Sequence, residues 1–177
     1  GYGTHEHKAG SMLLARCLNE SGLNIHAKVV IDGKWPQREY EARPDSVVMY
    51  CDGFKRHLAK EHQSEIQAWV DHGVGVACLH FGVEVEPEHL GAQFLDWIGG
   101  YFEIGWSVNP HWTADFKDFP EHQITQGVQP FSILDEWYYH MRFQPEMKGV
   151  TPILSALPPV QSLTDRSEDS NRGSNPT

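Results

Sequence analysis

Histidines stand at two points where the chain is expected to pass between strands and helices. His5 and His7 lie in one polar loop directly before a run with helical periodicity, and His80 closes the apolar run 75–80. In open α/β domains, ligands bind at the carboxyl ends of the strands. Neutral imidazoles ligate divalent metals such as zinc, so His5, His7 and His80 are predicted metal ligands, and His80 is also a candidate general base. The alternatives are a solvated capping loop and a histidine hydrogen-bonded in the core.

A pair of carboxylates precedes a histidine in the segment Asp135-Glu136-Trp-Tyr-Tyr-His140. In a strand, Glu136, Tyr138 and His140 would share one face. Glu136 and His140 are therefore predicted to act as an acid–base pair or as ligands of a shared cation. The alternative is a salt-bridged strand near Arg142, because ion-pair networks resemble sites.

An aromatic loop carries the third candidate, His111 beside Trp112. A tryptophan next to a hydrogen-bonding ring suits stacking on a sugar, and Tyr138 would line the same sugar. A packed loop that covers the core is an equally good interpretation.

Alternating elements must position these residues. Helical periodicity, period-two alternation and short apolar runs predict helices over 8–21, 58–72 and 87–98 and strands over 25–31, 46–51 and 75–80. This order predicts an α/β fold, a mostly parallel sheet with helices on both faces. The second half is rich in aromatics and is expected to add strands over 131–143 and 150–157.

Composition and charge argue against several classes of function. The chain has 177 residues and a formal net charge of −10. It is long enough to bury a core, but it lacks the basic surface that non-specific nucleic-acid binding or docking on anionic lipid requires. No apolar run approaches the length of a membrane span.

Several kinds of site are not predicted. Gly73 and Gly75 precede a strand rather than a helix, so the dinucleotide-binding context is missing and no nucleotide cofactor is expected. The serine-hydrolase elbow Gly-X-Ser-X-Gly is absent. The three cysteines lie in apolar stretches and are expected to be buried. The remaining histidines are predicted to be surface residues: His26, His57, His62, His72, His89 and His122.

Six stretches resemble, in this order, motifs of the ThuA-like (trehalose-utilisation) family: 4–10, 50–53, 75–80, 97–103, 109–114 and 135–143. The resemblance runs from Gly1 to about Pro159. It implies a flavodoxin-like fold related to class I glutamine amidotransferases. Family members begin with a strand ahead of the His-Glu-His loop and continue into a Gly-Gly-His-X-His-like segment and a final helix. We therefore expect 1–160 to be a ThuA-like domain truncated at both ends, followed by a polar, flexible tail over 161–177.

The resemblance places His80 where amidotransferases carry a nucleophilic cysteine, and Cys78 where they carry a small residue inside the strand. Because a thiolate is required at that elbow, the chain is not expected to be a functional glutamine amidotransferase. The resemblance implies carbohydrate utilisation, with a small trehalose-like or keto-glycoside substrate and a divalent metal such as zinc. A non-catalytic sugar-binding or accessory module is the alternative, and an amidotransferase-like partner protein is a third. Catalysis itself, a homo-oligomer, and a bacterial cytoplasmic or periplasmic location are left open.

Overall fold

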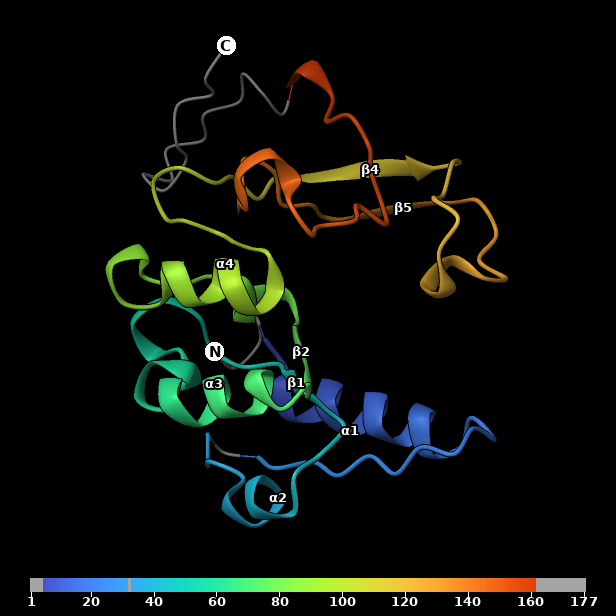
Figure 1. Cartoon of the computed structure of the whole chain (residues 1–177). Coiled ribbons are helices and arrows are strands. Elements are labelled where there is room, and N and C mark those ends of the chain that lie inside the picture. The colour runs from blue at the N-terminus through green and yellow to red at the C-terminus, as the bar shows by residue number, and fades with distance from the viewer. Residues whose placement is uncertain (1–4, 32, 162–177) are drawn as a thin grey trace. The chain divides into compact units, whose positions relative to one another are not determined.

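The computed structural model describes residues 5–31 and 33–161 (Figure 1). The chain divides into two compact units, Gly1–Gln93 and Phe94–Thr177, with the boundary inside helix α4 (Ala92–Ile98). The predicted flexible tail lies, from residue 162 onward, outside the described residues.

Two parallel strands form the centre of the first unit. Strand β1 (Ser46–Met49) pairs with β2 (Gly75–Cys78), in a register that runs from Ser46 opposite Gly75 to Met49 opposite Cys78. Both strands were predicted from short apolar runs, and both predictions are confirmed. Parallel strands need a long crossover, and here it contains α3 (Gln63–Asp71).

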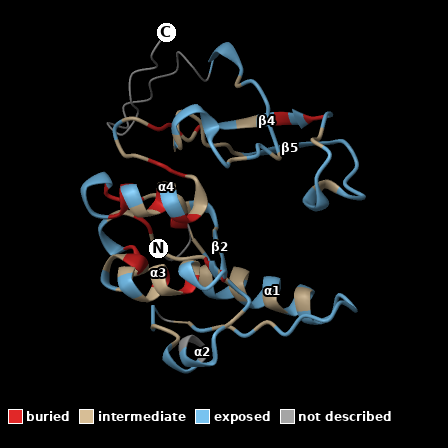
Figure 2. Cartoon of the chain, in the orientation of Figure 1, coloured by how far each residue is buried: buried red, intermediate tan, exposed pale blue. Residues whose placement is uncertain are grey.

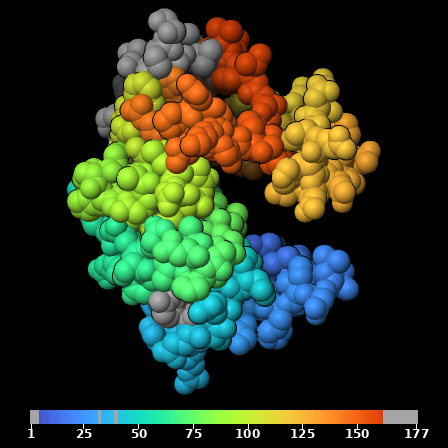
Figure 3. Space-filling model, viewed as in Figure 1, coloured from blue at the N-terminus to red at the C-terminus, as the bar shows by residue number. Residues whose placement is uncertain are grey.

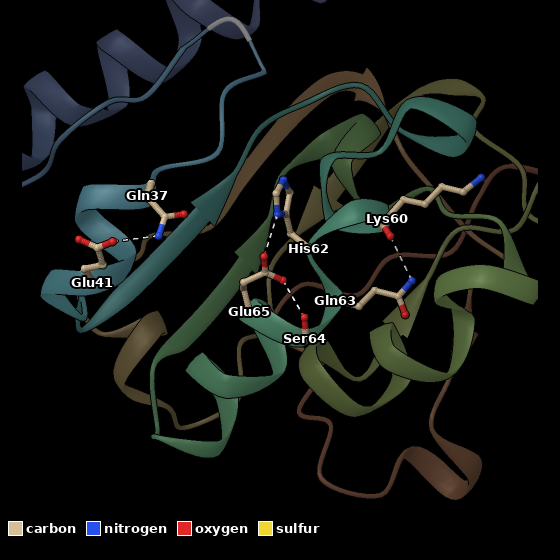
Figure 4. A network of polar contacts seen from close by, with 7 residues as sticks. All are labelled: Gln37, Glu41, Lys60, His62, Gln63, Ser64 and Glu65. Carbon is tan, nitrogen blue, oxygen red and sulfur yellow. Dashed lines mark hydrogen bonds and ion pairs between the residues drawn. The ribbon is translucent and has the colours of Figure 1, made fainter.

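Helix α1 (His7–Asn19) is also confirmed, while the predicted helix over 58–72 is divided. A 3-10 turn covers Leu58–Glu61, and α3 starts only after His62, whose φ of −127° and ψ of 29° are not helical. At this junction His62 Nδ1 lies 3.3 Å from Glu65 Oε1, and Ser64 Oγ donates to Glu65 Oε2 (Figure 4). The carboxylate of Glu65 therefore lies in the first turn of α3, where the helix dipole favours negative charge.

The predicted strand over 25–31 is wrong, since this segment forms no strand and belongs to no sheet. Asn19, the last residue of α1, forms two hydrogen bonds to this segment with its side-chain amide. Its Nδ2 donates to the carbonyl of Ala27 at 3.0 Å, and its Oδ1 accepts from the amide of Ala27 at 2.8 Å. The backbone groups of Ala27 are thus satisfied by a side chain rather than by a neighbouring strand. The first unit also contains the short helix α2 (Gln37–Ala42).

The predicted helix over 87–98 is present as a π-helical turn, Pro87–Gly91, that runs directly into α4. Proline stands at the first position of this turn, where its missing N–H costs nothing. Buried residues lie on α3 and on the turn that leads into α4 (Figure 2), and in the first unit they include Ile66, Trp69 and Leu90.

Two antiparallel pairs build the second unit. Strand β3 (Gly100–Tyr101) pairs with β6 (Arg142–Phe143), and β4 (His111–Phe116) pairs with β5 (Phe131–Glu136). The connection 117–130 between β4 and β5 projects as a lobe on the surface of this unit (Figure 3). Phe102, Val108 and Ala114 are among its buried apolar side chains.

The two strands predicted for the second half need correction. The strand expected over 131–143 is interrupted between β5 and β6, where His140 has a φ of 60°. The stretch 150–157 forms no strand. The amide of Val150 donates to the carbonyl of Met147 in a turn, and Pro152 has no N–H to offer a sheet.

The α/β class predicted from the sequence is confirmed as a mixture of helices and small sheets. The described residues form three two-stranded sheets, of which the β1–β2 pair is parallel and the other two pairs are antiparallel. The structure therefore does not show the predicted mostly parallel sheet. Within the same residues, no helix is long and apolar enough to cross a membrane.

Candidate functional site

Three potential metal ligands come together in the first unit. His5 and His7 lie at the start of α1, and Asp52 follows β1. One ligand atom from each side chain lies within 4.8 Å of the others, and His7 Nδ1 is 3.8 Å from Asp52 Oδ1. Two imidazoles and a carboxylate form a donor set that zinc accepts in proteins.

His80 joins this group through its ring. Its centroid lies 5.0 Å from that of His5, and His5 also stacks on His7 at 5.5 Å and on Phe81 at 4.9 Å. The predicted metal ligands His5, His7 and His80 are thus brought together by the fold. Within the described residues, the cluster with ligand atoms in mutual reach contains Asp52 rather than His80.

The backbone at His80 has the form of a strained elbow. β2 ends at Cys78, a 3-10 turn spans His80–Val83, and His80 itself has a φ of 51°. A left-handed conformation is costly for a residue with a Cβ, on the order of 1–3 kcal/mol, and such residues cluster at functional sites. The sequence placed His80 at a strand-to-helix elbow, and this backbone geometry agrees with that placement.

The surroundings of His5 and His7 favour the neutral form of these two side chains. Burial lowers the pKa of His5, and the neighbouring His80 lowers it further. Burial also lowers the pKa of His7, although the carboxylate of Asp52 partly opposes this shift. The neutral imidazole is the form that ligates a metal. In addition, His7 Nε2 is buried and has no hydrogen-bond partner among the described residues.

Asp52 was not singled out in the sequence, although it directly follows an apolar run, and a polar residue that closes such a run was the signal that identified His80. Its carboxylate is shared between two neighbours. Oδ1 faces His7, and Oδ2 lies 3.0 Å from the guanidinium of Arg56. Arg56 thereby orients the carboxylate while leaving the other oxygen on the histidine side.

His57 was predicted to be a surface histidine, and this prediction is wrong. The residue is only 2% exposed. It lies in the loop after β1 and contacts the elbow of His80 through the carbonyl of Gly82. No local pattern revealed this burial, because the contact joins residues 25 positions apart.

The cysteines near the elbow are unsuited to nucleophilic chemistry. Burial raises the pKa of the Cys78 thiol to about 12 and also raises the pKa of the Cys51 thiol. A thiol with a pKa this high carries almost no thiolate at neutral pH. Cys17 is exposed, contrary to the expectation that all three cysteines are buried.

In the second unit, the side chain of Glu136 has polar contacts with neighbouring candidate residues. It lies directly across the strand pair from His111, and Asn109 Nδ2 donates to its Oε1 at 2.7 Å. The hydroxyl of Tyr138 lies 3.5 Å from its Oε2, at the limit of a hydrogen bond. Three residues singled out in the sequence, His111, Glu136 and Tyr138, are therefore neighbours, and Asn109 joins them.

The predicted pairing of Glu136 with His140 on one strand face is not formed, because β5 ends at Glu136 and His140 turns the chain with its positive φ. The ring of His140 instead stacks on Trp106 at 5.3 Å. The guanidinium of Arg142, which is ion-paired with Glu103, lies 3.9 Å from the Trp106 ring. The alternative interpretation, a salt bridge near Arg142, thus holds for Arg142 itself, but its partner is Glu103 and not Glu136.

Trp112 lies opposite Asp135 in the strand pair and is half-buried. Its indole Nε1 is buried without a hydrogen-bond partner in the described part of the chain. A sugar-stacking role for Trp112 therefore stays a prediction.

Comparisons with known proteins bear on the identity of the chain. A search of curated proteins finds no match, and a search of solved structures finds none. A family model described as ThuA, trehalose utilisation, matches residues 1–167. This match covers almost the whole sequence and includes the loop of His5 and His7, the elbow of His80 and the Glu136 segment, so the chain belongs to the ThuA family of trehalose utilisation.

Proposed function

We propose that the protein processes a carbohydrate of the trehalose-like or keto-glycoside class with the help of a divalent metal. Membership of the ThuA family supports the role in trehalose utilisation. The observation that carries the metal is the cluster of His5, His7 and Asp52, with ligand atoms within 4.8 Å of one another.

The residues present fit a metal such as zinc. Burial lowers the pKa of both imidazoles, which favours the neutral form that ligates a metal, and His7 Nε2 is buried without a hydrogen-bond partner among the described residues. Bound there, the ion would polarise a carbonyl or glycosidic oxygen as a Lewis acid. Arg56 would keep the carboxylate of Asp52 in place.

His80 is proposed as the general base. Its ring contacts His5, and its elbow presents it at the end of β2. In the second unit, taken by itself, Glu136 and His140 are proposed as separate acid–base groups rather than as a pair, and His111, Trp112 and Tyr138 as residues that bind the sugar. Asn109 supports the role of Glu136, because its amide fixes one carboxylate oxygen.

The family suggests that β1 and β2 belong to a flavodoxin-like, amidotransferase-like sheet, and we propose this fold for the domain. The proposed partner is a small carbohydrate, and no nucleotide cofactor takes part. Glutamine hydrolysis is not proposed, because histidine stands at the elbow.

The test combines metal binding with turnover. We expect the wild-type chain to bind Zn²⁺ in calorimetry and to turn over at least one compound of a keto-glycoside panel. His7→Ala should lose Zn²⁺ binding, whereas His26→Ala, at an exposed histidine of the same unit, should not. A wild-type chain without Zn²⁺ binding and without turnover would contradict the proposal. Sugar binding without turnover would identify a non-catalytic sugar-binding module instead.

A further inference from the structure

His57 has both ring nitrogens occupied by backbone groups. Its Nδ1 accepts from the amide of Ala59 at 3.0 Å, and its Nε2 lies 2.9 Å from the carbonyl oxygen of Gly82. A nitrogen that accepts an amide proton carries no hydrogen, so the hydrogen of the neutral ring must be on Nε2, which donates to Gly82. Burial lowers the pKa of His57, which agrees with a neutral ring.

This hydrogen bond joins two loops that carry site residues. Asp52 and His57 belong to the loop after β1, and Gly82 belongs to the elbow that begins at His80. The amide of Phe54 also donates to the carbonyl of Glu84 at 2.8 Å. Gly53 lies so close that a Cβ there would be 2.3 Å from the carbonyl oxygen of Phe81.

A strained elbow needs such support. The φ of 51° at His80 persists only where the surroundings over-determine it. The backbone contacts of the 3-10 turn include one from the amide of Gly82 to the carbonyl of Leu79 at 3.0 Å and one from the amide of Glu84 to the carbonyl of Phe81 at 3.1 Å. The carbonyl of Gly82 is held from outside the turn, by His57.

We propose that His57 is a positioning residue for the site: its Nε2–H holds the elbow of His80 against the loop of Asp52. The contact between the His5 and His80 rings then depends on His57, although His57 itself is neither a proposed metal ligand nor a proposed substrate-binding residue. This inference rests on the proposed function for the purpose of the site, but the positioning itself can be tested without metal or substrate.

Two substitutions separate positioning from simple packing. His57→Gln can place its amide donor at the position of Nε2 toward Gly82, whereas the shorter side chain of His57→Asn can accept from the amide of Ala59 but leaves no donor at the position of Nε2. The His5–His80 ring contact is followed by nuclear Overhauser effects in the metal-free protein, and Zn²⁺ affinity by calorimetry. Thermal unfolding midpoints report on the overall stability of each variant.

We expect His57→Gln to keep the ring contact and His57→Asn to lose it. Zn²⁺ affinity should fall about 10- to 100-fold in His57→Asn, because the loop that carries the proposed ligand Asp52 is then no longer held against the elbow, and His57→Gln should retain most of the affinity. The inference is overturned if both variants lower the unfolding midpoint equally while the ring contact and affinity stay unchanged. It is also overturned if His57→Asn keeps the contact and His57→Gln loses it.

A measurement on the wild type keeps the test decisive if the variants do not fold. Histidine ¹⁵N spectra should show His57 as the Nε2–H tautomer, with its proton protected from exchange by the bond to Gly82. An Nδ1–H tautomer would overturn the inference. If the wild type binds no Zn²⁺, the metal site of the proposed function fails, while the tautomer and the ring contact still decide the role of His57.

Discussion

His7 and Asp52 face each other, with Nδ1 of the imidazole 3.8 Å from Oδ1 of the carboxylate. This distance is too long for a hydrogen bond between nitrogen and oxygen. The two groups are therefore at ion-pair distance without a hydrogen bond between them, and each is a potential metal ligand. The second oxygen of Asp52 is held at 3.0 Å by Arg56, which fixes the carboxylate from the opposite side.

The first prediction concerns the charge of Asp52. Asp52→Asn keeps the shape of the side chain but removes the anionic ligand, so Zn²⁺ affinity should fall by at least about tenfold. Calorimetric titration measures the change. Asp45→Asn, at an exposed aspartate ahead of β1, is the matched control and should leave the affinity unaltered. Equal affinities for Asp52→Asn and wild type would exclude Asp52 as a ligand.

The second prediction separates the two roles assigned to His80. The ligand cluster consists of His5, His7 and Asp52, so His80→Ala should change Zn²⁺ affinity only slightly. Loss of a general base should lower turnover of the keto-glycoside substrate by about 10²- to 10⁴-fold. If Zn²⁺ affinity in His80→Ala drops as far as in His7→Ala, His80 is a metal ligand and not primarily a base.

The third prediction concerns the pH dependence of stability. Burial holds the pKa of His57 below its ordinary value of 6.5 in the folded chain. Between the folded pKa and 6.5, the unfolded chain binds a proton that the folded chain does not, so the free energy of unfolding falls as the pH drops below 6.5. The contribution approaches about 1.4 kcal/mol per pH unit at most.

Urea unfolding of wild type and His57→Gln between pH 5 and 8 isolates this contribution, because His5 and His7 add the same slope to both proteins. We expect the wild type to lose more stability toward acid than His57→Gln does. Parallel curves would show that His57 does not titrate on unfolding in this range.

The fourth prediction uses the thiols. Cys17 is exposed, whereas burial raises the pKa of Cys51 and raises that of Cys78 to about 12. With a disulfide reagent at pH 8, one cysteine of the native chain should react rapidly. Reaction of all three cysteines should require denaturant. Cys17→Ser should remove the fast phase. Rapid labelling of Cys78 in that variant would contradict the burial of the Cys78 thiol.

The fifth prediction concerns the close approach of two loops. A Cβ at Gly53 would lie 2.3 Å from the carbonyl oxygen of Phe81 and 2.9 Å from that of Glu84. Gly53→Ala should therefore destabilise the chain by about 1–3 kcal/mol through overpacking. Gly75→Ala is the control, because its Cβ would lie 3.4 Å from the Cβ of Ser46. Denaturant unfolding of the two variants measures the difference.

The elements predicted correctly are those whose pattern is local. β1 and β2 are short apolar runs, and α1 shows its helical period in the sequence. The stretch 25–31 also alternates, but alternation does not reveal whether a partner strand exists. Here the hydrogen bonds of Ala27 go to Asn19, which no periodicity predicts.

The site divides in the same way. His5, His7 and His80 were found because they lie where strands and helices meet, and Asp52 obeys the same rule but was overlooked. His57 could not be found by this rule, since its burial depends on a contact with Gly82 across the fold. The expected face of Glu136, Tyr138 and His140 failed because a single positive φ at His140 ends the strand geometry.

The left-handed backbone of His80 has a consequence for laboratory evolution. Glycine adopts a φ of 51° without the penalty that a Cβ brings. A library selected for heat resistance alone should therefore enrich glycine or asparagine at this position, and His80→Gly should unfold at a higher temperature than the wild type. A library selected for turnover should hold the histidine. At position 80, selection for thermostability and selection for turnover are thus expected to favour different residues.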